Sequence, residues 1–394
     1  MLFFKDLDLH NKRVFLRVDF NVPLDENGNI TDDTRIKAVL PTLNHLSNHK
    51  AQVIIGSHLG RPKGKKDSKL SLKPVAQMLS SMLPQKITLA PDCIGKQVSQ
   101  LKSHQKKQDI ILLENLRFHP EEKQNDDEFA RELAEDIDYY VNDAFAACHR
   151  SHASIVAITQ FVKKAAAGFV VRQEMDYFQR IIEAPQRPYI AILGGAKVSD
   201  KIPVLKNLIK KADAILIGGA MSYTFFKAMK FEVGRSLVEE DKKDLSLELL
   251  KKAEDKGVKV FLPSDHVIAK EMKPGAEYKN ITRFPIPNEY MGLDIGPETI
   301  KKYSKFINNA KTVFWNGPMG VFEIKEFSQG TAQIAKAVAS SDTLSIVGGG
   351  DSVSALKKTG LEKKISHIST GGGASLELIA NETLPGIKVL SEDI

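Results

Sequence analysis

The sequence predicts an α/β fold made of two doubly wound, Rossmann-like domains with parallel sheets, joined by a linker helix and a hinge. Three observations lead to this prediction. Short apolar runs alternate with helical patterns along the chain, which is typical of parallel sheets covered by helices on both faces. The length of 394 residues exceeds what one hydrophobic core usually supports. The turns that follow the apolar runs also differ in composition between the two halves.

Apolar runs that read as buried strands are found in both halves. The first half has four such runs, at residues 14–20, 51–57, 109–115 and 138–146. The second half has six, at residues 189–195, 214–220, 259–263, 312–318, 344–350 and 367–373. Between the last two runs of the first half, Phe129, Leu133 and Ile137 are spaced by four residues. This spacing favours a helix through that segment.

A candidate linker helix lies between the halves, within residues 170–188. Val171, Met175, Phe178 and Ile182 recur there at helical spacing, and the segment ends in prolines. We therefore expect an N-terminal domain over 1–170, a linker helix over 171–185 and a C-terminal domain that begins at 186.

Composition excludes several classes of protein. No apolar run approaches the roughly 18 residues of a membrane helix. The two cysteines, Cys93 and Cys148, belong to no CxxC pair, which argues against a disulfide framework or a zinc site and favours the cytoplasm. The net charge of +7 suggests an anionic partner. The basic run at 63–69 has no aromatic interleaving, so a solvated loop is expected there and no nucleic acid.

The residues after the strands divide the chain into two chemistries. In parallel sheets, ligands bind beyond the carboxyl ends of the strands. In the first half the strand ends and following loops each contain an arginine: Arg17, Arg61, Arg117 and Arg150. In the second half they contain glycine clusters: Gly194 and Gly195, Gly218 and Gly219, Gly348 to Gly350, and Gly371 to Gly373.

These two sets predict two anion sites of different kinds. Arginine offers a planar fork of donors that suits carboxylate and phosphate oxygens, so the first half is predicted to hold a compact polyanion. Glycine lets backbone amides approach a phosphate closely, and a following helix presents its positive end, so the second half is predicted to hold a nucleotide. In the strand VFLRVDFNVP, Arg17, Asp19 and Asn21 share one face by alternation and would form the floor of the first site.

Each signal also has a structural explanation when it is taken alone. Arg17 and Asp19 could form a same-face ion pair, and a single glycine pair is common in tight turns. The common position of both sets, after the strands, favours ligand binding. The sequence contains no GxxxxGK[ST] loop and no GxGxxG that opens a βαβ unit, which argues against a phosphate-loop ATPase and a dehydrogenase.

Seven blocks closely resemble phosphoglycerate kinases and occur in the family's order: VFLRVDFNVP, SHLGRP, ENLRFH, GGAKVSDKI, FWNGPMGVFE, GGGDS and STGGGASLE. They extend from residue 14 to residue 377. The resemblance implies reversible phosphoryl transfer between 1,3-bisphosphoglycerate and ADP, giving 3-phosphoglycerate and ATP, with Mg²⁺. It also implies that the C-terminal domain ends at 378 and that residues 379–394 return to the N-terminal domain.

The resemblance assigns candidate residues to each ligand. Those for 3-phosphoglycerate are Asp19, Asn21, Arg35, His58, Arg61, Arg117 and Arg150. Those for the nucleotide are Gly194, Gly195, Lys197, Lys201, Gly218, Gly219, Asn316, Glu323, Gly350, Asp351, Ser352 and Val353, with Asp351 also the expected Mg²⁺ ligand. The transferring group is expected to meet Arg35, Lys201 and the amides of Gly371, Gly372 and Gly373.

The expected mechanism is positioning and charge neutralisation, because phosphoryl transfer has a loose transition state with charge on its equatorial oxygens. The acceptor is already a carboxylate, so no covalent intermediate or side-chain base is needed. The two domains must close to exclude water. A monomer without nucleic-acid or membrane partners is expected. Two alternatives stay open at this point, a binding protein that closes on a small anion and an oxidoreductase with a variant glycine-rich fold.

Overall fold

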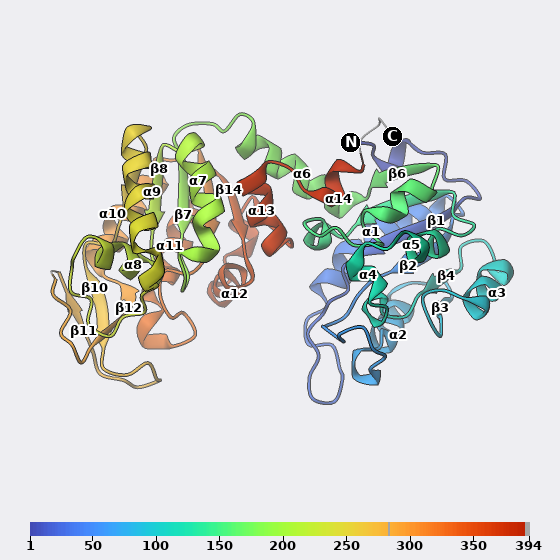
Figure 1. Cartoon of the computed structure of the whole chain (residues 1–394), viewed down its shortest axis with the longest axis horizontal. Helices are drawn as coiled ribbons and strands as arrows, with labels where there is room; N and C mark the ends of the chain where they lie inside the picture. The colour runs from blue at the N-terminus through green and yellow to red at the C-terminus, as the bar shows by residue number, and fades with distance from the viewer. Residues whose placement is uncertain (283, 391–394) are drawn as a thin grey trace. The chain divides into compact units, whose positions relative to one another are not determined.

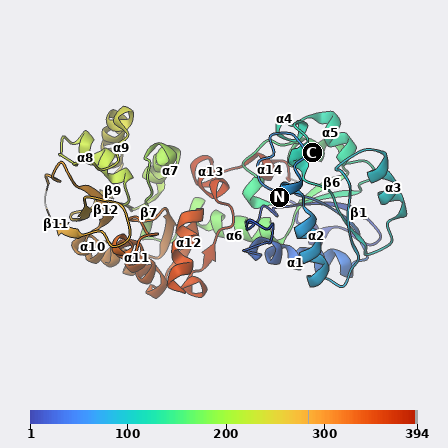
Figure 2. The ribbon, with the colours of Figure 1, turned by 90° about the horizontal axis from the view of Figure 1, so that it is seen from below.

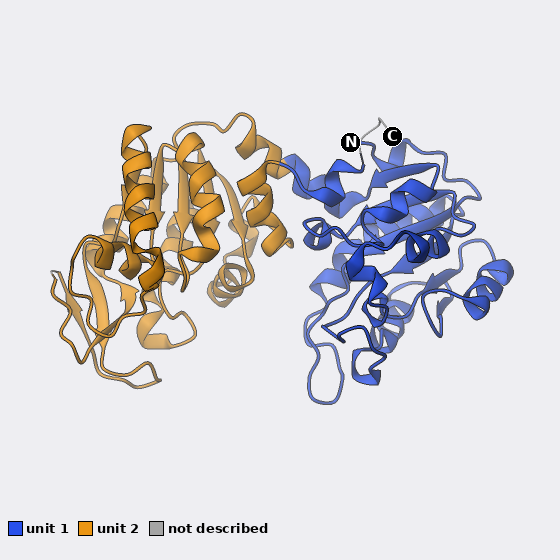
Figure 3. Cartoon of the chain, in the orientation of Figure 1, with its two compact units in different colours: residues 1–176, 383–394 blue, residues 177–382 orange. Residues whose placement is uncertain are grey.

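The computed structural model describes residues 1–282 and 284–390. The chain divides into two compact units (Figure 3). Unit 1 is Met1–Asp176 with Thr383–Ile394, of which 383–390 are described, and unit 2 is Tyr177–Glu382. None of the helices in the described part of the chain is long and apolar enough to cross a membrane.

Unit 1 is built on a parallel sheet of six strands in the order β3-β4-β2-β1-β5-β6 (Figure 1). Its strands are β1 (Arg13–Val18), β2 (Gln52–Gly56), β3 (Ile87–Leu89), β4 (Ile110–Leu112), β5 (Tyr139–Asp143) and β6 (Lys164–Ala167). Its helices are α1 (Thr34–Asn48), α2 (Lys73–Met82), α3 (Lys96–His104), α4 (Glu121–Gln124), α5 (Asp127–Leu133) and α14 (Pro385–Lys388). Figure 2 shows α1 and α2 on one side of the sheet and α4 and α5 on the other.

The central strand β1 explains why this sheet is buried on both faces. Residues Val14 to Val18 of the strand are all buried, and β1 pairs in parallel with β2 and with β5. Burial of successive residues, and not only of alternate ones, is typical of a strand covered by helices on both faces. The loops that follow β1, β2 and β5 therefore leave the sheet at the same edge.

Unit 2 contains a second parallel sheet, in the order β15-β14-β13-β7-β8-β9. Its strands are β7 (Tyr189–Leu193), β8 (Ala214–Ile217), β9 (Lys259–Phe261), β13 (Thr312–Asn316), β14 (Leu344–Gly348) and β15 (His367–Ile368). Its helices are α7 (Ile202–Lys211), α8 (Met221–Ala228), α9 (Lys243–Asp255), α10 (Pro297–Asn308), α11 (Gln329–Ser340), α12 (Gly350–Thr359) and α13 (Gly373–Asn381). Figure 2 shows α7, α8 and α9 on one face and α10 and α11 on the other.

The two parallel sheets confirm the predicted α/β class. Unit 2 adds an element that the sequence analysis did not predict, an antiparallel sheet of β10 (His266–Ala269), β11 (Tyr278–Ile281) and β12 (Met291–Ile295), in the order β11-β10-β12. The edge strand β11 is largely exposed and shows no apolar alternation, so periodicity could not reveal it. The strands β3 and β6 of unit 1 also went unpredicted.

Two helices can be compared with their sequence patterns. The helix expected through Ile137 is α5, which ends at Leu133, and Ile137 is buried in the turn before β5. The expected linker helix is α6 (Phe169–Ile182), and the division between the units falls within it, at Asp176 and Tyr177. Val171 and Phe178 are fully buried, as their helical spacing suggests.

Asp143, at the end of β5, anchors the start of α6. Its carboxylate accepts hydrogen bonds from the amides of Val170 at 2.7 Å and Val171 at 3.3 Å, and from the hydroxyl of Thr42 in α1 at 2.5 Å. The first turn of a helix leaves amides without partners, so the oxygen acceptors of Asp143 stabilise this helix start by hydrogen bonding, even though burial raises the pKa of Asp143 to about 7. These contacts join the start of α6 to β5 and to α1.

The C-terminal end of the chain packs on unit 1. The amide of Leu2 donates to the carbonyl of Leu390 at 2.9 Å, and the amide of Gly386 donates to the carbonyl of Cys148 at 2.8 Å. A β-carbon on Gly386 would lie 2.9 Å from Cα of Cys148. The expected return of residues 379–394 includes 391–394, which lie outside the described residues.

Gly168, between β6 and α6, tests the anchor of α6. An alanine β-carbon there would lie 2.4 Å from Cγ and Oδ1 of buried Asp143, so we expect Gly168→Ala to destabilise unit 1 by about 1–3 kcal/mol. The matched control is Gly350→Ala, whose β-carbon meets no atom within 4 Å. Urea unfolding followed by circular dichroism, with the single tryptophan Trp315 reporting unit 2, measures both. An unchanged midpoint for Gly168→Ala would contradict the anchoring role.

Candidate functional site

The residues predicted to bind 3-phosphoglycerate, called the basic group of unit 1 below, lie at the carboxyl edge of its sheet. Asp19 and Asn21 follow β1, His58 and Arg61 follow β2, Arg117 follows β4 and Arg150 follows β5. Arg35 is the second residue of α1. Because β1, β2, β4 and β5 are parallel, these loops share one edge of the sheet. The site residues predicted for 3-phosphoglycerate are thus brought to the same end of unit 1.

Arg35, Asn21 and His58 lie around Asp19. Arg35 donates from Nη1 to Oδ2 of Asp19 and, at 3.3 Å, to the carbonyl of Asn21. Nδ1 of His58 lies 3.8 Å from Oδ1 of Asp19. Burial and, next, the cations Arg17, Arg117 and Arg35 hold the pKa of His58 well below its usual range. His58 is therefore neutral at physiological pH and offers one donor and one acceptor.

Gly60 links two further residues to the same group. Its amide donates to Oδ1 of Asn21 at 2.8 Å, and its carbonyl accepts from Nη1 of Arg117 at 2.8 Å. Burial, followed by repulsion from Arg17 and Arg150, lowers the pKa of Arg117 to about 10. Gly60, which the sequence analysis did not single out, thus holds a predicted amide and a predicted guanidinium in place through its backbone.

Arg61 and Arg150 differ from the rest of the group. Both side chains are exposed, and no side-chain hydrogen bond or ion pair joins either to another described residue. A guanidinium without a protein partner is free to bind an anion bidentately. Buried polar atoms without a hydrogen-bond partner in the described residues also occur here: Nε of Arg117, Nδ1 of His149 and Nδ1 of His152. Such atoms are costly unless water or a ligand satisfies them.

The expected place of Arg17 is wrong. By alternation it shares a face with Asp19, but it is fully buried, and its Nε donates to the hydroxyl of Ser154 at 2.8 Å. The strand ends at Val18, so Arg17 still belongs to the sheet and points into its covered face, whereas Asp19 already lies in the loop. Arg17 lies beneath the group and does not form part of its floor.

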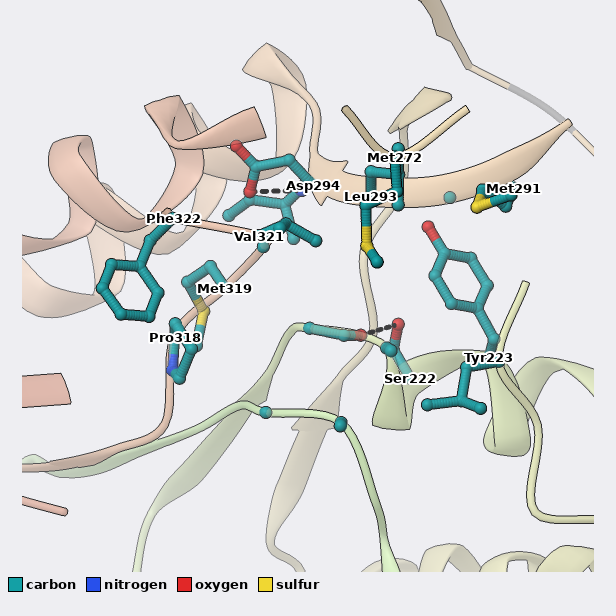
Figure 4. A pocket seen from close by; sticks show the side chains of 18 of the residues that line it. Ser222, Tyr223, Met272, Met291, Leu293, Asp294, Pro318, Met319, Val321 and Phe322 are labelled. Carbon is teal, nitrogen blue, oxygen red and sulfur yellow. Dashed lines mark hydrogen bonds between the residues drawn. The ribbon is translucent and has the colours of Figure 1, made fainter. Parts of the chain in front are cut away.

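Unit 2 contains a cavity of about 460 Å³ beside the glycine turns. Four of the predicted nucleotide residues line it, namely Gly195, Gly219, Glu323 and Asp351. The remaining walls are largely apolar, with Tyr223, Met272, Met291, Leu293, Pro318 and Met319 shown in Figure 4. A mostly apolar cleft with a few placed polar groups is typical of a cofactor or nucleotide site.

The glycines after β7 and β8 allow these turns to pack closely. A β-carbon on Gly194 would lie 2.1 Å from the carbonyl oxygen of Pro318, and one on Gly218 would lie 2.5 Å from Sδ of Met319. Gly219 has φ +67°, and a side chain there would meet the backbone of Gly195 at 2.6 Å. Gly194 and Gly218 therefore support the cavity from behind, whereas Gly195 and Gly219 face it.

A polar group lies next to this cavity, where β13 and β14 end. Asn316 accepts from Nζ of Lys201 and donates to the carbonyl of Gly348 at 2.8 Å. The hydroxyl of Ser352 accepts from the amide of Gly317 at 2.6 Å. Burial lowers the pKa of Lys201, while Asp200 and Asp351 act in the opposite direction. This group connects Lys201 to the glycine turn that opens α12.

The two glycine-rich helix starts differ in exposure. Gly350 begins α12, is exposed, and is followed by exposed Asp351 and half-buried Val353. Gly371 is buried, with its amide donating to the hydroxyl of Ser369 at 3.1 Å, while Gly373 is exposed at the start of α13. Free amides at a helix start form an anion site because the helix dipole adds to them. Lys197 is exposed in the loop after β7.

The antiparallel sheet supplies cavity residues that the sequence analysis missed. Met291 and Leu293 belong to β12, and Tyr223 belongs to α8 (Figure 4). Asp294 also lines the cavity, and burial raises its pKa to about 8. Its carboxylate accepts from the amides of Gly330 at 2.7 Å and Ile295 at 2.9 Å. The analysis missed Met291, Leu293 and Asp294 because it predicted no strand there, and the pattern of α8 does not mark Tyr223 as a cavity residue.

Comparisons with known proteins agree with this arrangement. A sequence model described as phosphoglycerate kinase matches residues 4–382. The phosphoglycerate kinase of Anaeromyxobacter dehalogenans strain 2CP-C is 55% identical over 388 residues, which cover 98% of each chain. That of Geotalea uraniireducens strain Rf4 is 53% identical over 386 residues, covering 98% of this chain and 97% of the other.

Solved structures give the same result. The phosphoglycerate kinase from Coxiella burnetii aligns with a TM-score of 0.90 and 41% identity, covering 99% of this chain and 98% of that one. The enzyme from Pyrococcus horikoshii OT3 aligns with a TM-score of 0.83 and 36% identity over the same shares. Similarity of sequence and of fold along nearly the whole length leaves no place for the binding-protein and oxidoreductase alternatives. The chain belongs to the phosphoglycerate kinase family.

Proposed function

We propose that 3-phosphoglycerate binds the basic group of unit 1 and that the nucleotide binds the cavity of unit 2. The activity itself follows from the family: the chain is an ATP:3-phosphoglycerate 1-phosphotransferase of glycolysis, and it uses ATP and ADP. One observation supports the proposed division most strongly. Arg61 and Arg150, whose guanidinium groups have no side-chain hydrogen bond or ion pair to another described residue, lie in loops of unit 1, whereas the largely apolar cavity lies in unit 2.

The ligand of unit 1 is held by complementary chemistry. Asp19 is an acceptor for a hydroxyl group, and Asn21 has its amide nitrogen left for the carboxylate end, because its Oδ1 already accepts from Gly60. Arg61 and Arg150 bind the negative charges bidentately, since neither is engaged by the protein. His58, Arg35 and Arg117 are positioned by neighbours and add fixed donors around the same anion.

The nucleotide in unit 2 uses the apolar walls for its base and the helix start for its phosphates. Gly195 and Gly219 leave room for the adenine, with Gly194 and Gly218 supporting them. The exposed carboxylate of Glu323 accepts from the ribose hydroxyls. Lys197, Lys201 and the turn at Gly350, Ser352 and Val353 hold the phosphate chain, and Asn316 orients Lys201 through their hydrogen bond.

Asp351 has the properties of a ligand for the Mg²⁺ that accompanies the nucleotide. It lines the cavity, its side chain is exposed, and no hydrogen bond or ion pair joins its carboxylate to another described residue. Mg²⁺ prefers hard oxygen ligands and typically combines one or two carboxylates with substrate phosphates. When bound, the ion neutralises phosphate charge.

The mechanism requires only binding, orientation and charge neutralisation by the protein. The attacking group is the carboxylate of 3-phosphoglycerate, which needs no base. Arg35, Lys201 and the amides of Gly371, Gly372 and Gly373 offset the charge on the equatorial oxygens of the transferring group. The two bound substrates must meet and exclude water, so we propose that α6 acts as part of a hinge that permits closure.

We also propose a cytoplasmic monomer. Both cysteines are buried free thiols, which favours a reducing compartment. A single chain contains both sets of ligand-binding residues, so the activity needs no second copy. Sedimentation velocity on the active enzyme measures its mass, and a species heavier than one chain would contradict the proposal. The activity is measured by ATP consumption that depends on 3-phosphoglycerate.

The Mg²⁺ role predicts a selective defect in Asp351→Asn. The apparent affinity for Mg–ADP should fall, while affinities for metal-free ADP and for 3-phosphoglycerate stay unchanged, because only the metal ligand is lost. Calorimetric titration of each ligand measures this without relying on turnover. Asp342→Asn, an exposed aspartate in the loop before β14, is the matched control. An equal loss of affinity for both substrates in Asp351→Asn would instead indicate disturbed folding.

The catalytic role predicts that Arg35→Ala and Lys201→Ala each lower turnover by about 10²–10³, as for other donors to transition-state charge. Ground-state affinities should weaken far less, because other groups also hold each substrate. Steady-state kinetics with direct binding measurements separate the two effects. Lys37→Ala in α1 and Lys206→Ala in α7 are controls. If Arg35→Ala raises only the KM for 3-phosphoglycerate, Arg35 is a binding group and not a catalytic residue.

A further inference from the structure

A buried ionic layer lies beneath the basic group of unit 1. Glu122 of α4 and Arg17 of β1 are both fully buried, and Nη2 of Arg17 lies 3.9 Å from Oε1 of Glu122. Ser154 bridges them: its hydroxyl donates to Oε1 of Glu122 at 2.7 Å and accepts from Nε of Arg17 at 2.8 Å. The amide of Ser154 also donates to Oε2 of Glu122 at 2.9 Å. Neither charge is part of the site described above.

Glu122 is ionised in this layer. Burial alone would raise the pKa of its carboxyl, but the interactions with His152, with the cation of Arg17 and with the hydroxyl of Ser154 outweigh burial and hold this pKa below its usual range. His152 lies nearby, with Nδ1 at 3.6 Å from Oε1, which is too long for a hydrogen bond. A buried arginine without a counter-charge is strongly destabilising. Glu122 therefore stabilises Arg17 without adding negative charge at the surface of the site.

Arg17 connects this layer to His58. Its Nη1 donates to the carbonyl of Val18, and its Nη2 lies 3.4 Å from Nδ1 of His58. A guanidinium has only donors, so Nδ1 of neutral His58 is the acceptor in this contact. The proton of the ring then resides on Nε2, for which no hydrogen bond to another described residue exists. The contact with Arg17 thus fixes both the ring orientation and its tautomer.

We propose that Glu122 is a positioning residue for 3-phosphoglycerate, which acts through Arg17 to keep the proton of His58 on Nε2 and available to the bound anion. This inference rests on the proposed place of 3-phosphoglycerate in unit 1. In the proposed site His58 must act as a donor to the bound anion, because a carboxylate or ionised phosphate offers only acceptors. A purely structural role for Glu122 would stabilise the fold without changing the tautomer of His58.

The test compares Glu122→Gln with Glu121→Gln, the neighbouring glutamate at the start of α4, as the matched control. Glutamine keeps the shape and an acceptor for Ser154 but removes the charge that holds Arg17. We expect Glu122→Gln to lower the affinity for 3-phosphoglycerate about tenfold, which is the usual effect of losing one hydrogen bond to a charged group. ADP affinity should not change. Calorimetry on the full chain measures both, and nitrogen NMR shifts of the histidine rings report the tautomer of His58 directly.

A double-mutant cycle with His58→Gln distinguishes positioning from general disturbance. If Glu122 acts through His58, the double variant binds 3-phosphoglycerate no more weakly than His58→Gln alone. Additive losses, or an unchanged His58 tautomer in Glu122→Gln, would overturn the inference. If His58→Gln itself has no effect on 3-phosphoglycerate, the proposed site fails, and this inference with it.

Ser154→Ala provides a milder second variant in case Glu122→Gln does not fold. It removes the hydroxyl that joins Arg17 to Glu122 and leaves both charges in place. The same change of tautomer and the same non-additivity with His58→Gln are expected, with a smaller loss of affinity. Ser154→Ala with an unaltered His58 signal and unaltered 3-phosphoglycerate affinity would contradict the role assigned to this layer.

Discussion

The single direction of the strands in each large sheet is the constraint on which the rest of the structure depends. Because every strand of a sheet runs the same way, the loops that follow them leave at one edge. Side chains separated by more than a hundred residues meet there, such as Lys201 and Asn316. The same arrangement occurs in both units: arginine-bearing loops share one edge of the sheet in unit 1, and glycine turns share one edge of the sheet in unit 2.

In unit 1, two arginines that are buried or half-buried have a counter-charge within the protein, whereas the exposed arginines of the site do not. The buried guanidinium of Arg17 has a buried partner in Glu122, and half-buried Arg35 has one in Asp19. The exposed side chains of Arg61 and Arg150 have none. These two cations without a counter-charge are therefore exposed, where water stabilises them until an anion binds. Burying such a cation without a partner would cost too much desolvation energy. In unit 2, the proposed nucleotide site instead uses backbone amides and closely packed glycine turns to bind its ligand, and few buried charges are needed for this.

The sequence allowed the fold class and most of the site loops to be predicted, because apolar runs and the turns after them are local signals. The cavity walls were different. Met291, Leu293 and Tyr223 belong to an antiparallel sheet and a helix whose patterns do not mark them as binding residues. Arg17 was misplaced because alternation gives the face of a residue but not the point at which a strand ends. The pairing of Arg17 with Glu122 depends on tertiary contacts, which no local pattern encodes.

The most direct test of the division between the units is amide hydrogen exchange of the full chain with one substrate at a time. Saturating 3-phosphoglycerate should slow exchange in the loops of unit 1 at residues 19–21, 57–61, 115–117 and 149–150. Saturating ADP should slow exchange at residues 194–197, 218–220, 291–295 and 349–353 of unit 2. Protection of the glycine turns by 3-phosphoglycerate alone, or of the arginine loops by ADP alone, would contradict the account.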